Sequence, residues 1–396
     1  MPTPNQLTWK QKCQFCQVVS AGHEAFALVC RTFRIARQTG YRWWRRYRQG
    51  GESALVEKSR RPLRPARQLR PHWLERIAQA RRRYPRWGPK KLRAVLRRDH
   101  PRARLPAASS IGRVLRRLHL SLPRPRRPRG PVRLWPAFRR ARRPNDVWTV
   151  DFKGHFPAAD GTRCEPLTVR DRFSRYGLCA RVLPDRSEGR ARGQFVVLFR
   201  RHGQPHTLHC DQGGPFGSAG PAHLSRLSAW WVSLGITVEF SRRARPGDNA
   251  AHEQWHRELK AETARPPAAT LLAQQRRTQR WLHHYNQERP HEALGQQTPA
   301  QHWHPSRRNY RGMRPARYPR GWEVRRVQQR GEINWRGRVR FVSEALAGYP
   351  IGLRRRNQRV WHVYFYEIFI GELHDGQAGP LRAARHRRRV YARKKL

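Results

Sequence analysis

The chain has 396 residues, enough for two or three domains. Its 85 lysines and arginines outnumber 26 aspartates and glutamates, which gives a formal net charge of +59 and a pI near 11.9. A charge of that size favours a polyanionic partner, and nucleic acid is the leading candidate. No apolar run reaches the roughly 18–20 residues of a membrane span, and no signal peptide opens the chain, so no membrane partner is expected. We expect a cytoplasmic protein, nucleoid-associated in a prokaryote.

The six cysteines are too few in so long a chain for a disulfide framework. Cys13 and Cys16 are spaced as C-x-x-C, but no second pair at zinc spacing follows, so a metal site is not expected there. Cys164, Cys179 and Cys210 fall in strand-like segments and are expected to be buried thiols.

Residues 8–58 are predicted to form a helix-turn-helix DNA-binding domain. Phe26, Val29 and Phe33 give an apolar face at helical spacing, a turn follows at 34–36, and a basic, aromatic helix comes next. A plain helical hairpin with a solvated basic face is the alternative. The candidate DNA contacts on the second helix are Gln38, Thr39, Tyr41, Arg42, Arg45 and Arg46.

Residues 66–120 are predicted to form a second helical DNA-binding domain. Helices are expected over 73–84 and 87–96, and a third over 109–115, capped by a serine. The candidate DNA contacts in this domain are Lys90, Lys91, Ser110 and Arg113. The stretch 121–144 is rich in proline and arginine and contains no acid, which predicts a basic linker.

The composition changes at about residue 145, where an α/β domain is predicted over 145–305. The order of elements fits a mixed sheet flanked by helices. Asp160-Gly161 supplies a turn between the first two strands. Strands are expected at 147–156, 164–171, 176–183, 206–210 and 236–240, and helices at 188–201, 222–234, 249–263 and 268–287.

Beyond residue 318 the pattern changes again. Apolar and polar residues alternate through 318–380, which predicts a small all-β domain, either a barrel or a meander. The segment 381–396 is a basic tail. The whole chain is therefore predicted to be multidomain, with a helical front, an α/β core and an all-β end.

Three acidic residues of the α/β domain stand in contexts that fit one chemistry. Asp151 lies near the end of the first strand, Asp211 ends the fourth, and Glu253 lies one turn inside a later helix. Carboxylates at the end of a sheet can hold two divalent metals, which clamp the attacking and leaving oxygens of a phosphodiester displacement. Ligands that are all oxygen favour Mg²⁺ or Mn²⁺ over zinc.

Other residues compete for a role at this site. Asp248, Glu258 and Glu262 are rivals for the third ligand, and Asp171 ends a strand, where a structural salt bridge with arginine is expected. Lys260 lies two turns beyond Glu253 and either touches DNA or belongs to a solvated helix face. His209, two residues before Asp211, contacts substrate or packs; the sequence favours neither.

The chain resembles the insertion-sequence DDE transposases with a retroviral-integrase-type catalytic core. The resemblance covers most of the chain and includes Thr39-Gly40-Tyr41 and Trp87-Gly88-Pro89-Lys90-Lys91-Leu92 at the front. The core motifs that carry it are Asp-Val-Trp-Thr-Val-Asp-Phe-Lys-Gly (146–154), Pro-Leu-Thr-Val-Arg-Asp-Arg-Phe-Ser-Arg-Tyr (166–176), Cys-Asp-Gln-Gly-Gly-Pro-Phe (210–216), Pro-Gly-Asp-Asn-Ala-Ala-His-Glu (246–253), Leu-Lys-Ala-Glu (259–262), Tyr-Asn-Gln-Glu-Arg-Pro-His-Glu-Ala-Leu-Gly (285–295) and Thr-Pro-Ala (298–300).

This resemblance implies a ribonuclease-H-like core with Asp151, Asp211 and Glu253 as catalytic, metal-binding residues and two Mg²⁺ ions. It also implies binding of terminal inverted repeats and target double-stranded DNA, DNA cleavage, and strand transfer by a 3′-hydroxyl. A homo-oligomer assembled on paired DNA ends is expected. The alternative is a catalytically decayed copy that acts only as a DNA-binding protein.

Overall fold

The structure is a computed structural model that describes residues 7–57, 69–121, 140–242, 246–377 and 379–384. The chain divides into two compact units, one within residues 1–70 and one within residues 71–396. The predicted linker at 121–144 and the basic tail fall almost wholly outside the described residues. No described helix combines the length and apolar content that crossing a bilayer requires.

The first unit is a three-helix bundle around a small aromatic core. It contains α1 (Trp9–Ala21), α2 (Phe26–Thr32), α3 (Arg37–Gly50) and the short turn η1 (Glu52–Leu55). Phe15, Val29 and Trp43 are buried between the helices. Gly40 lets α3 approach closely, because a Cβ atom there would lie 2.7 Å from the sulfur of Cys30. The predicted helix-turn-helix is present, with α3 as its second helix.

The second unit opens with another three-helix module: α4 (Pro71–Arg83), α5 (Pro89–Asp99) and α6 (Ala108–Arg117). Pro89 occupies the first turn of α5, where its missing N–H costs nothing. The predicted serine cap of α6 is wrong. Ala107 is the N-cap and makes no side-chain bond, because Ser109 and Ser110 already lie inside the helix.

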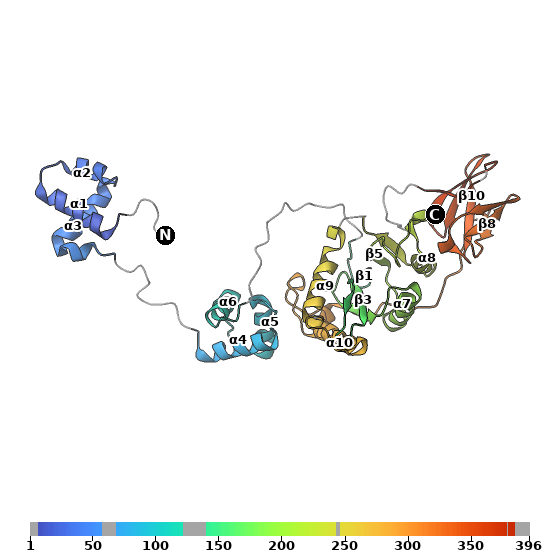
Figure 1. The fold of residues 1–396 in the computed structure, drawn as a ribbon, viewed down its shortest axis with the longest axis horizontal. Helices are drawn as coiled ribbons and strands as arrows, with labels where there is room; N and C mark the ends of the chain where they lie inside the picture. The colour runs from blue at the N-terminus through green and yellow to red at the C-terminus, as the bar shows by residue number, and fades with distance from the viewer. Residues whose placement is uncertain (1–6, 58–68, 122–139, 243–245, 378, 385–396) are drawn as a thin grey trace. The chain divides into compact units, whose positions relative to one another are not determined.

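A mixed sheet forms the centre of the second unit (Figure 1). Its central strands run in the order β3-β1-β5-β6, with β2 and β4 paired to β3. β1 pairs antiparallel with β3 and parallel with β5, and β5 pairs parallel with β6. The strands are β1 (Val147–Phe152), β2 (Phe156–Pro157), β3 (Arg163–Asp171), β4 (Gly177–Leu183), β5 (Thr207–Cys210) and β6 (Thr237–Phe240).

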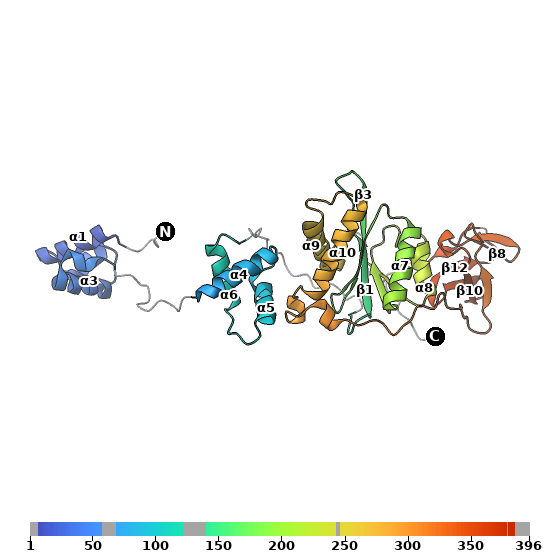
Figure 2. The ribbon, with the colours of Figure 1, turned by 90° about the horizontal axis from the view of Figure 1, so that it is seen from below.

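Helices cover both faces of this sheet, which is why its central strands are largely buried (Figure 2). One face packs on α7 (Glu188–His202) and α8 (Arg226–Ser233), and the other on α9 (Ala250–Thr263) and α10 (Leu271–Gln287). The predicted helix at 222–234 starts too early. Pro221–His223 form the turn η2, and Ser225 then caps α8.

The all-β domain follows two short turns, η4 (Glu292–Leu294) and η5 (Pro299–His302). It contains a five-stranded antiparallel sheet, in the order β13-β12-β11-β10-β7, and a separate β8–β9 hairpin beside the turn η6 (Glu344–Leu346). The strands are β7 (Glu323–Arg326), β8 (Glu332–Trp335), β9 (Arg338–Phe341), β10 (Pro350–Arg355), β11 (Val360–Phe365), β12 (Ile368–His374) and β13 (Arg382–Ala383). The predicted all-β end is confirmed, and of the two forms left open, barrel or meander, the consecutive antiparallel pairing of β10, β11 and β12 is that of a meander.

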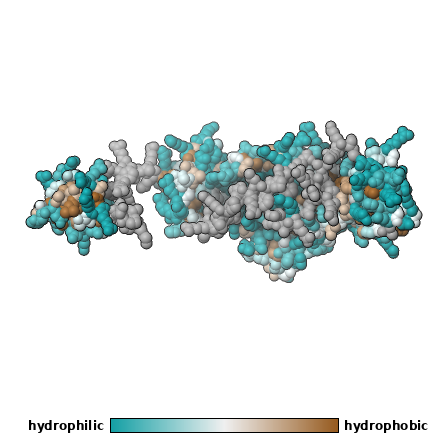
Figure 3. Space-filling view, turned by 90° about the horizontal axis from the view of Figure 1, so that it is seen from above, coloured by the Kyte–Doolittle hydropathy of each residue, from teal (hydrophilic) through white to brown (hydrophobic). Residues whose placement is uncertain are grey.

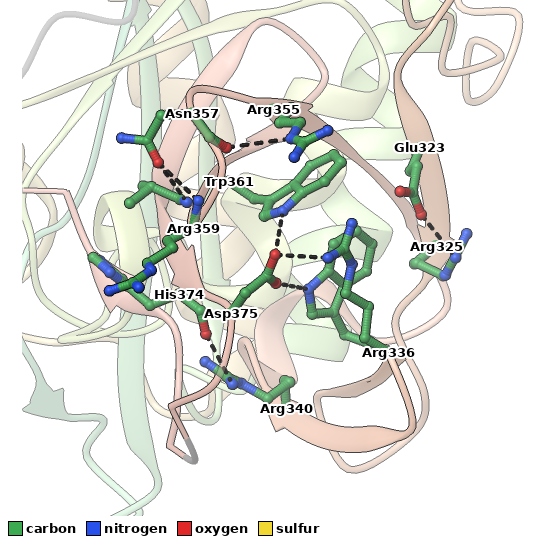
Figure 4. Close-up of polar contacts among 12 residues, drawn as sticks. Glu323, Arg325, Arg336, Arg340, Arg355, Asn357, Arg359, Trp361, His374 and Asp375 are labelled. Carbon is green, nitrogen blue, oxygen red and sulfur yellow. Dashed lines mark hydrogen bonds and ion pairs between the residues drawn. The ribbon is translucent and has the colours of Figure 1, made fainter.

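Asp375 ties the β-domain together at one end (Figure 4). Its carboxylate accepts a hydrogen bond from the indole of Trp361 at 3.0 Å and pairs with Arg336 at 2.7 Å. The domain shares one apolar cluster with the α7–α8 side of the core, where Tyr310 contacts the ring of Trp230 edge-on. The face of the molecule seen in Figure 3 is mostly hydrophilic over its described residues.

Candidate active site

Strand register places Asp151 beside Asp211. Thr149 of β1 pairs with His209 of the parallel strand β5, so the residues two positions further along each strand lie opposite one another. Neighbouring strands are about 4.8 Å apart. Both carboxylates therefore stand at the carboxyl end of two central strands, where open α/β sheets bind their ligands.

The raised pKa of Asp151 indicates a site where several acids lie close together. Desolvation, followed by the negative charge of Asp211, raises the pKa of Asp151 to about 7, and Glu253 adds to the increase. The backbone N–H of Phe152 and the charge of Lys153 oppose it. Asp211 and Glu253 thus both lie within electrostatic range of Asp151. Like charges held this close favour a bound cation.

Desolvation also raises the pKa of Asp211, opposed by a hydrogen bond from the backbone of Gly213 and by the charge of Arg186. Arg186 is itself bonded to the buried Glu165 and lies over the ring of Phe152. It therefore offsets the charge of Asp211 from a distance without neutralising it.

Two of the rivals of Glu253 on α9 already have partners within the chain. The buried guanidinium of Arg289 pairs with Glu258 at 2.6 Å and with Glu262 at 3.2 Å. Glu262 also accepts a hydrogen bond from the indole of Trp281 on α10. Both acids therefore hold α9 against α10 and the segment after it.

Asp248 is also engaged. It pairs with Arg242 at 2.6 Å, and the hydrogen bond from that arginine lowers its pKa. Asn249 stands at the N-cap of α9, though without a side-chain bond. Glu253, half-buried in the first turn of α9, is left as the acid of this helix that acts on Asp151.

A buried network of histidines and threonines joins α9 to the strand that bears Asp151. The Thr168 hydroxyl donates to the backbone carbonyl of Asp151 at 2.8 Å. The same oxygen lies 2.7 Å from Nε2 of His252 and 2.6 Å from Nε2 of His256. Nδ1 of His252 lies 2.8 Å from the Thr149 hydroxyl, and Nδ1 of His256 lies 3.6 Å from the Asp151 carboxylate.

Proton counting assigns the tautomers in this network. The single hydroxyl proton of Thr168 goes to the Asp151 carbonyl, so both histidines must donate to Thr168 through Nε2. Burial, the largest cause, lowers the pKa of His256 to about 3 and that of His252 well below its usual range, so both rings are neutral. The sequence analysis missed this network, although His252 and His256 flank Glu253 by one and three residues.

Two lysines border the carboxylates. Desolvation and then the charge of Lys260 lower the pKa of Lys153, while Asp151 raises it. The Lys153 ammonium group therefore lies near both Lys260 and Asp151. Lys260 was predicted as a possible DNA contact; Lys153 was missed, although it follows Asp151 by only two residues.

Oxygen donors from three carboxylates suit a hard divalent cation such as Mg²⁺. Within the described parts of the chain, however, no three histidine, cysteine, aspartate or glutamate side chains converge closely enough to hold an ion together. The donor chemistry fits the metal, and full chelation needs the carboxylates to move closer together.

Two further predictions from this sheet can be scored. Asp171 is structural, but the expected arginine salt bridge is wrong, because its carboxylate accepts hydrogen bonds from the backbone of Asn145 and from Ser174. His209 is buried and lies 3.0 Å from the Ser241 hydroxyl. It is a packing residue in this structure.

The candidate DNA contacts of the first unit lie on α3. Gln38, Tyr41, Arg42 and Arg45 are exposed, and Thr39 and Arg46 are half-buried. Tyr41 stacks on Phe26 with ring centroids 4.2 Å apart, which fixes its ring at the surface. These positions suit a recognition helix, and their contacts with bases or phosphates stay a prediction.

The candidate contacts of the second module separate into two groups. Lys90 forms an ion pair with Glu292. Half-buried Lys91 lies within electrostatic range of Glu258, Glu262 and Glu292, so both lysines have acidic neighbours within the chain. Burial and then Arg289 lower the pKa of Lys91 to about 8. A DNA contact at either lysine stays a prediction. Ser110 and Arg113 lie on α6, where Arg113 donates to the Ser110 hydroxyl.

Comparison with known families finds three matching domains. Residues 141–246 and 234–299 both match the family described as integrase core domain. Residues 39–115 match a homeodomain-like domain, which spans α3 and most of the α4–α6 module.

Two curated relatives come from bacterial insertion elements. One is the insertion element IS407 uncharacterized 31.7 kDa protein of Burkholderia multivorans, 27% identical over 58% of this chain and 78% of its own length. The other is the insertion element IS476 uncharacterized 39.2 kDa protein of Xanthomonas euvesicatoria, 30% identical over 60% of this chain and 65% of its own length.

Among solved structures, the chain is similar to the HTLV-2 integrase catalytic core domain in complex with magnesium, with 17% identity and a TM-score of 0.34. That match covers 42% of this chain and 100% of the other. It is also similar to the simian T-cell lymphotropic virus intasome in complex with PP2A regulatory subunit B56 gamma, with 13% identity and a TM-score of 0.36. This second match covers 72% and 91% of the two chains.

Proposed function

We propose that this chain is an insertion-element transposase with a retroviral-integrase-type core, and that it cuts and joins DNA strands through Asp151, Asp211 and Glu253. The observation that carries the proposal is the parallel register of β1 and β5, which brings two acids together in a chain of net charge +59. Acids are scarce in this chain, and the repulsion between these two ionised carboxylates is unfavourable unless a cation binds to both.

The three carboxylates are the proposed ligands of two Mg²⁺ or Mn²⁺ ions. When bound, such ions stabilise the charge on the attacking and leaving oxygens of a phosphodiester displacement. The role of Glu253 requires α9 to bring it closer to the two aspartates, and the position of α9 relative to β1 depends on the bridge through Thr168 and the two histidines.

The chain's own residues then position the reacting DNA. Lys153 and Lys260 offer ammonium groups to the phosphates beside Asp151. In cleavage, a water oxygen forms the new bond to phosphorus and a 3′-oxygen leaves. In strand transfer, the freed 3′-hydroxyl attacks a phosphodiester of target DNA, and the 3′-oxygen of the target strand leaves.

The two helical modules are proposed to bind the terminal inverted repeats of the element, and the chain is proposed to work as a homo-oligomer on paired ends. The homeodomain-like match over residues 39–115 supports DNA binding by these helices. Exposed polar and basic residues along α3 support the same role for the first unit.

Strand transfer in Mg²⁺, on a labelled duplex that carries the element's own terminal repeat, tests this function. We expect joined product from the wild-type chain and none from Asp211→Asn, with unchanged affinity for the duplex. Asp185→Asn is the matched control, because Asp185 is an exposed carboxylate that pairs with nearby Arg190 and accepts a hydrogen bond from the backbone of Ser187. Duplex binding without product from the wild type would overturn the catalytic proposal and favour a DNA-binding protein without chemistry.

A further inference from the structure

A basic groove lies inside the α4–α6 module, away from the carboxylates. Its volume is about 750 Å³, and it runs between one face of α6 and the turn that joins α4 to α5. Four arginines line it: Arg81, Arg86, Arg113 and Arg116. Among the described residues that line this groove, none is acidic.

Arg81 is the most informative of these residues. Its side chain is only 7% exposed, and its Nη1 donates to the backbone carbonyl of Pro85 at 2.6 Å. Its Nε is buried and has no hydrogen-bond partner within the described structure. A buried guanidinium without a carboxylate is costly, and an anion in the groove would remove much of that cost.

Helix geometry adds to the positive potential. Both α5 and α6 begin at the groove, since Gly88, Pro89, Ala108 and Ser109 line it. Neither helix has a side-chain cap at its N-terminus. The first N–H groups of α6 are therefore available to an anion, and the dipoles of both helices favour negative charge there.

The shape of the groove favours a chain of phosphates over a single small anion. The ten residues of α6 span about 15 Å, equal to about four nucleotides of one strand at roughly 3.4 Å each. Arg113 and Arg116 are exposed along this face, and Gly112 packs closely on Pro89. Stacking of Trp87 on Tyr84, with centroids 3.9 Å apart, makes the adjoining wall rigid.

We propose that this groove is a phosphate clamp that grips one strand of double-stranded DNA through Arg81, Arg86, Arg113 and Arg116. The clamp reads backbone charge and not base sequence. Lys90 and Lys91 are not part of the clamp. Lys90 forms an ion pair with an acid of the core, and Lys91 lies within electrostatic range of such acids. This inference rests on the proposed function, because it supplies the DNA grip that a strand-joining enzyme needs.

The test compares two double variants of the full chain. Arg86→Gln with Arg116→Gln removes two exposed cations of the groove. Arg82→Gln with Arg117→Gln makes the same charge change on exposed residues of α4 and α6 that do not line the groove. Arg81 is left in place because it is packed. Affinity for a labelled DNA duplex is measured against salt concentration in EDTA, so that no cleavage occurs.

We expect the groove variant to weaken binding and to reduce the slope of log affinity against log salt by about 1.8, since each phosphate contact contributes about 0.9. The control variant should change the slope by much less. Equal slopes for the two variants would overturn the clamp. Inorganic phosphate that raises the melting temperature of the wild type but not of the groove variant, without a slope difference on DNA, would also overturn it in favour of a free-anion site.

Failure of the clamp and failure of the proposed chemistry are distinguishable. Binding in EDTA does not depend on Asp151, Asp211 or Glu253, so the slope result stands whether or not the wild-type chain joins strands. Conversely, normal strand joining with equal slopes for both variants would remove the clamp and leave the catalytic proposal intact.

Discussion

The carboxyl end of the core sheet and the groove of the α4–α6 module have opposite imbalances of charge. Asp151 and Asp211 stand together and each has a raised pKa, whereas the groove gathers four arginines and no acid. By contrast, the buried guanidinium of Arg289 is compensated by Glu258 and Glu262. In these three places charge is paired where it holds two helices together and unpaired where we propose that a metal ion or a phosphate binds.

The largest expected effect comes from removing charge at the sheet end. Asp151→Asn should lower the rate of strand joining by about 10³-fold, because the lost metal contact is worth several kcal/mol at about 1.4 kcal/mol per tenfold. The rate is measured from joined product in Mg²⁺ under single-turnover conditions. Asp185→Asn should retain the wild-type rate; an equal loss in both variants would mean that the sheet-end position of Asp151 is not special.

Breaking a compensated pair should act on stability instead. Arg289→Met leaves Glu258 and Glu262 without their partner and should lower the free energy of unfolding of the core by about 3 kcal/mol. Urea denaturation followed by circular dichroism measures it. Arg190→Met, at the exposed pair with Asp185, is the control and should leave the midpoint unchanged. A stable Arg289→Met variant would show that this pair does not hold α9 in place.

The network behind Asp151 should connect stability with chemistry. Thr168→Val removes the oxygen that accepts from two buried histidines and should cost about 1–3 kcal/mol of stability. Thr168→Ser keeps the hydroxyl and should restore both stability and strand joining. Urea midpoints and joined product are measured for both variants. If Thr168→Val and Thr168→Ser joined strands at equal rates at a temperature where both are folded, the proposal that Thr168 has a positioning role would be wrong.

The smallest effect is expected where a charge pair is exposed at both ends. Lys90 and Glu292 are 65% and 70% exposed, and surface pairs contribute little. Lys90→Gln should therefore leave the urea midpoint unchanged, and, since Lys90 is not part of the proposed clamp, it should also leave the salt slope of DNA binding unchanged. A reduced slope would return Lys90 to the set of DNA contacts.

The sequence predicted the parts of this arrangement that depend on local pattern. Strand alternation and turn residues located Asp151 and Asp211 at strand ends, and helical spacing located Glu253. The Thr168–His256 contact was missed because it joins residues 88 apart, and it depends on the register of β3 and the rotation of α9. The same limit explains Arg289, whose partners lie far back in the chain on α9. The serine cap of α6 is wrong for a local reason, because the helix begins before Ser109.

Metal binding tests the central claim most directly, because it needs neither DNA nor turnover. Mn²⁺ titrated into the full chain and followed by electron paramagnetic resonance measures the ions bound and their affinity. We expect binding by the wild type and by Asp185→Asn, loss with Asp151→Asn or Asp211→Asn, and weakening with Glu253→Gln. Equal Mn²⁺ binding by the wild type and both aspartate variants would contradict the proposal that these carboxylates form a metal site.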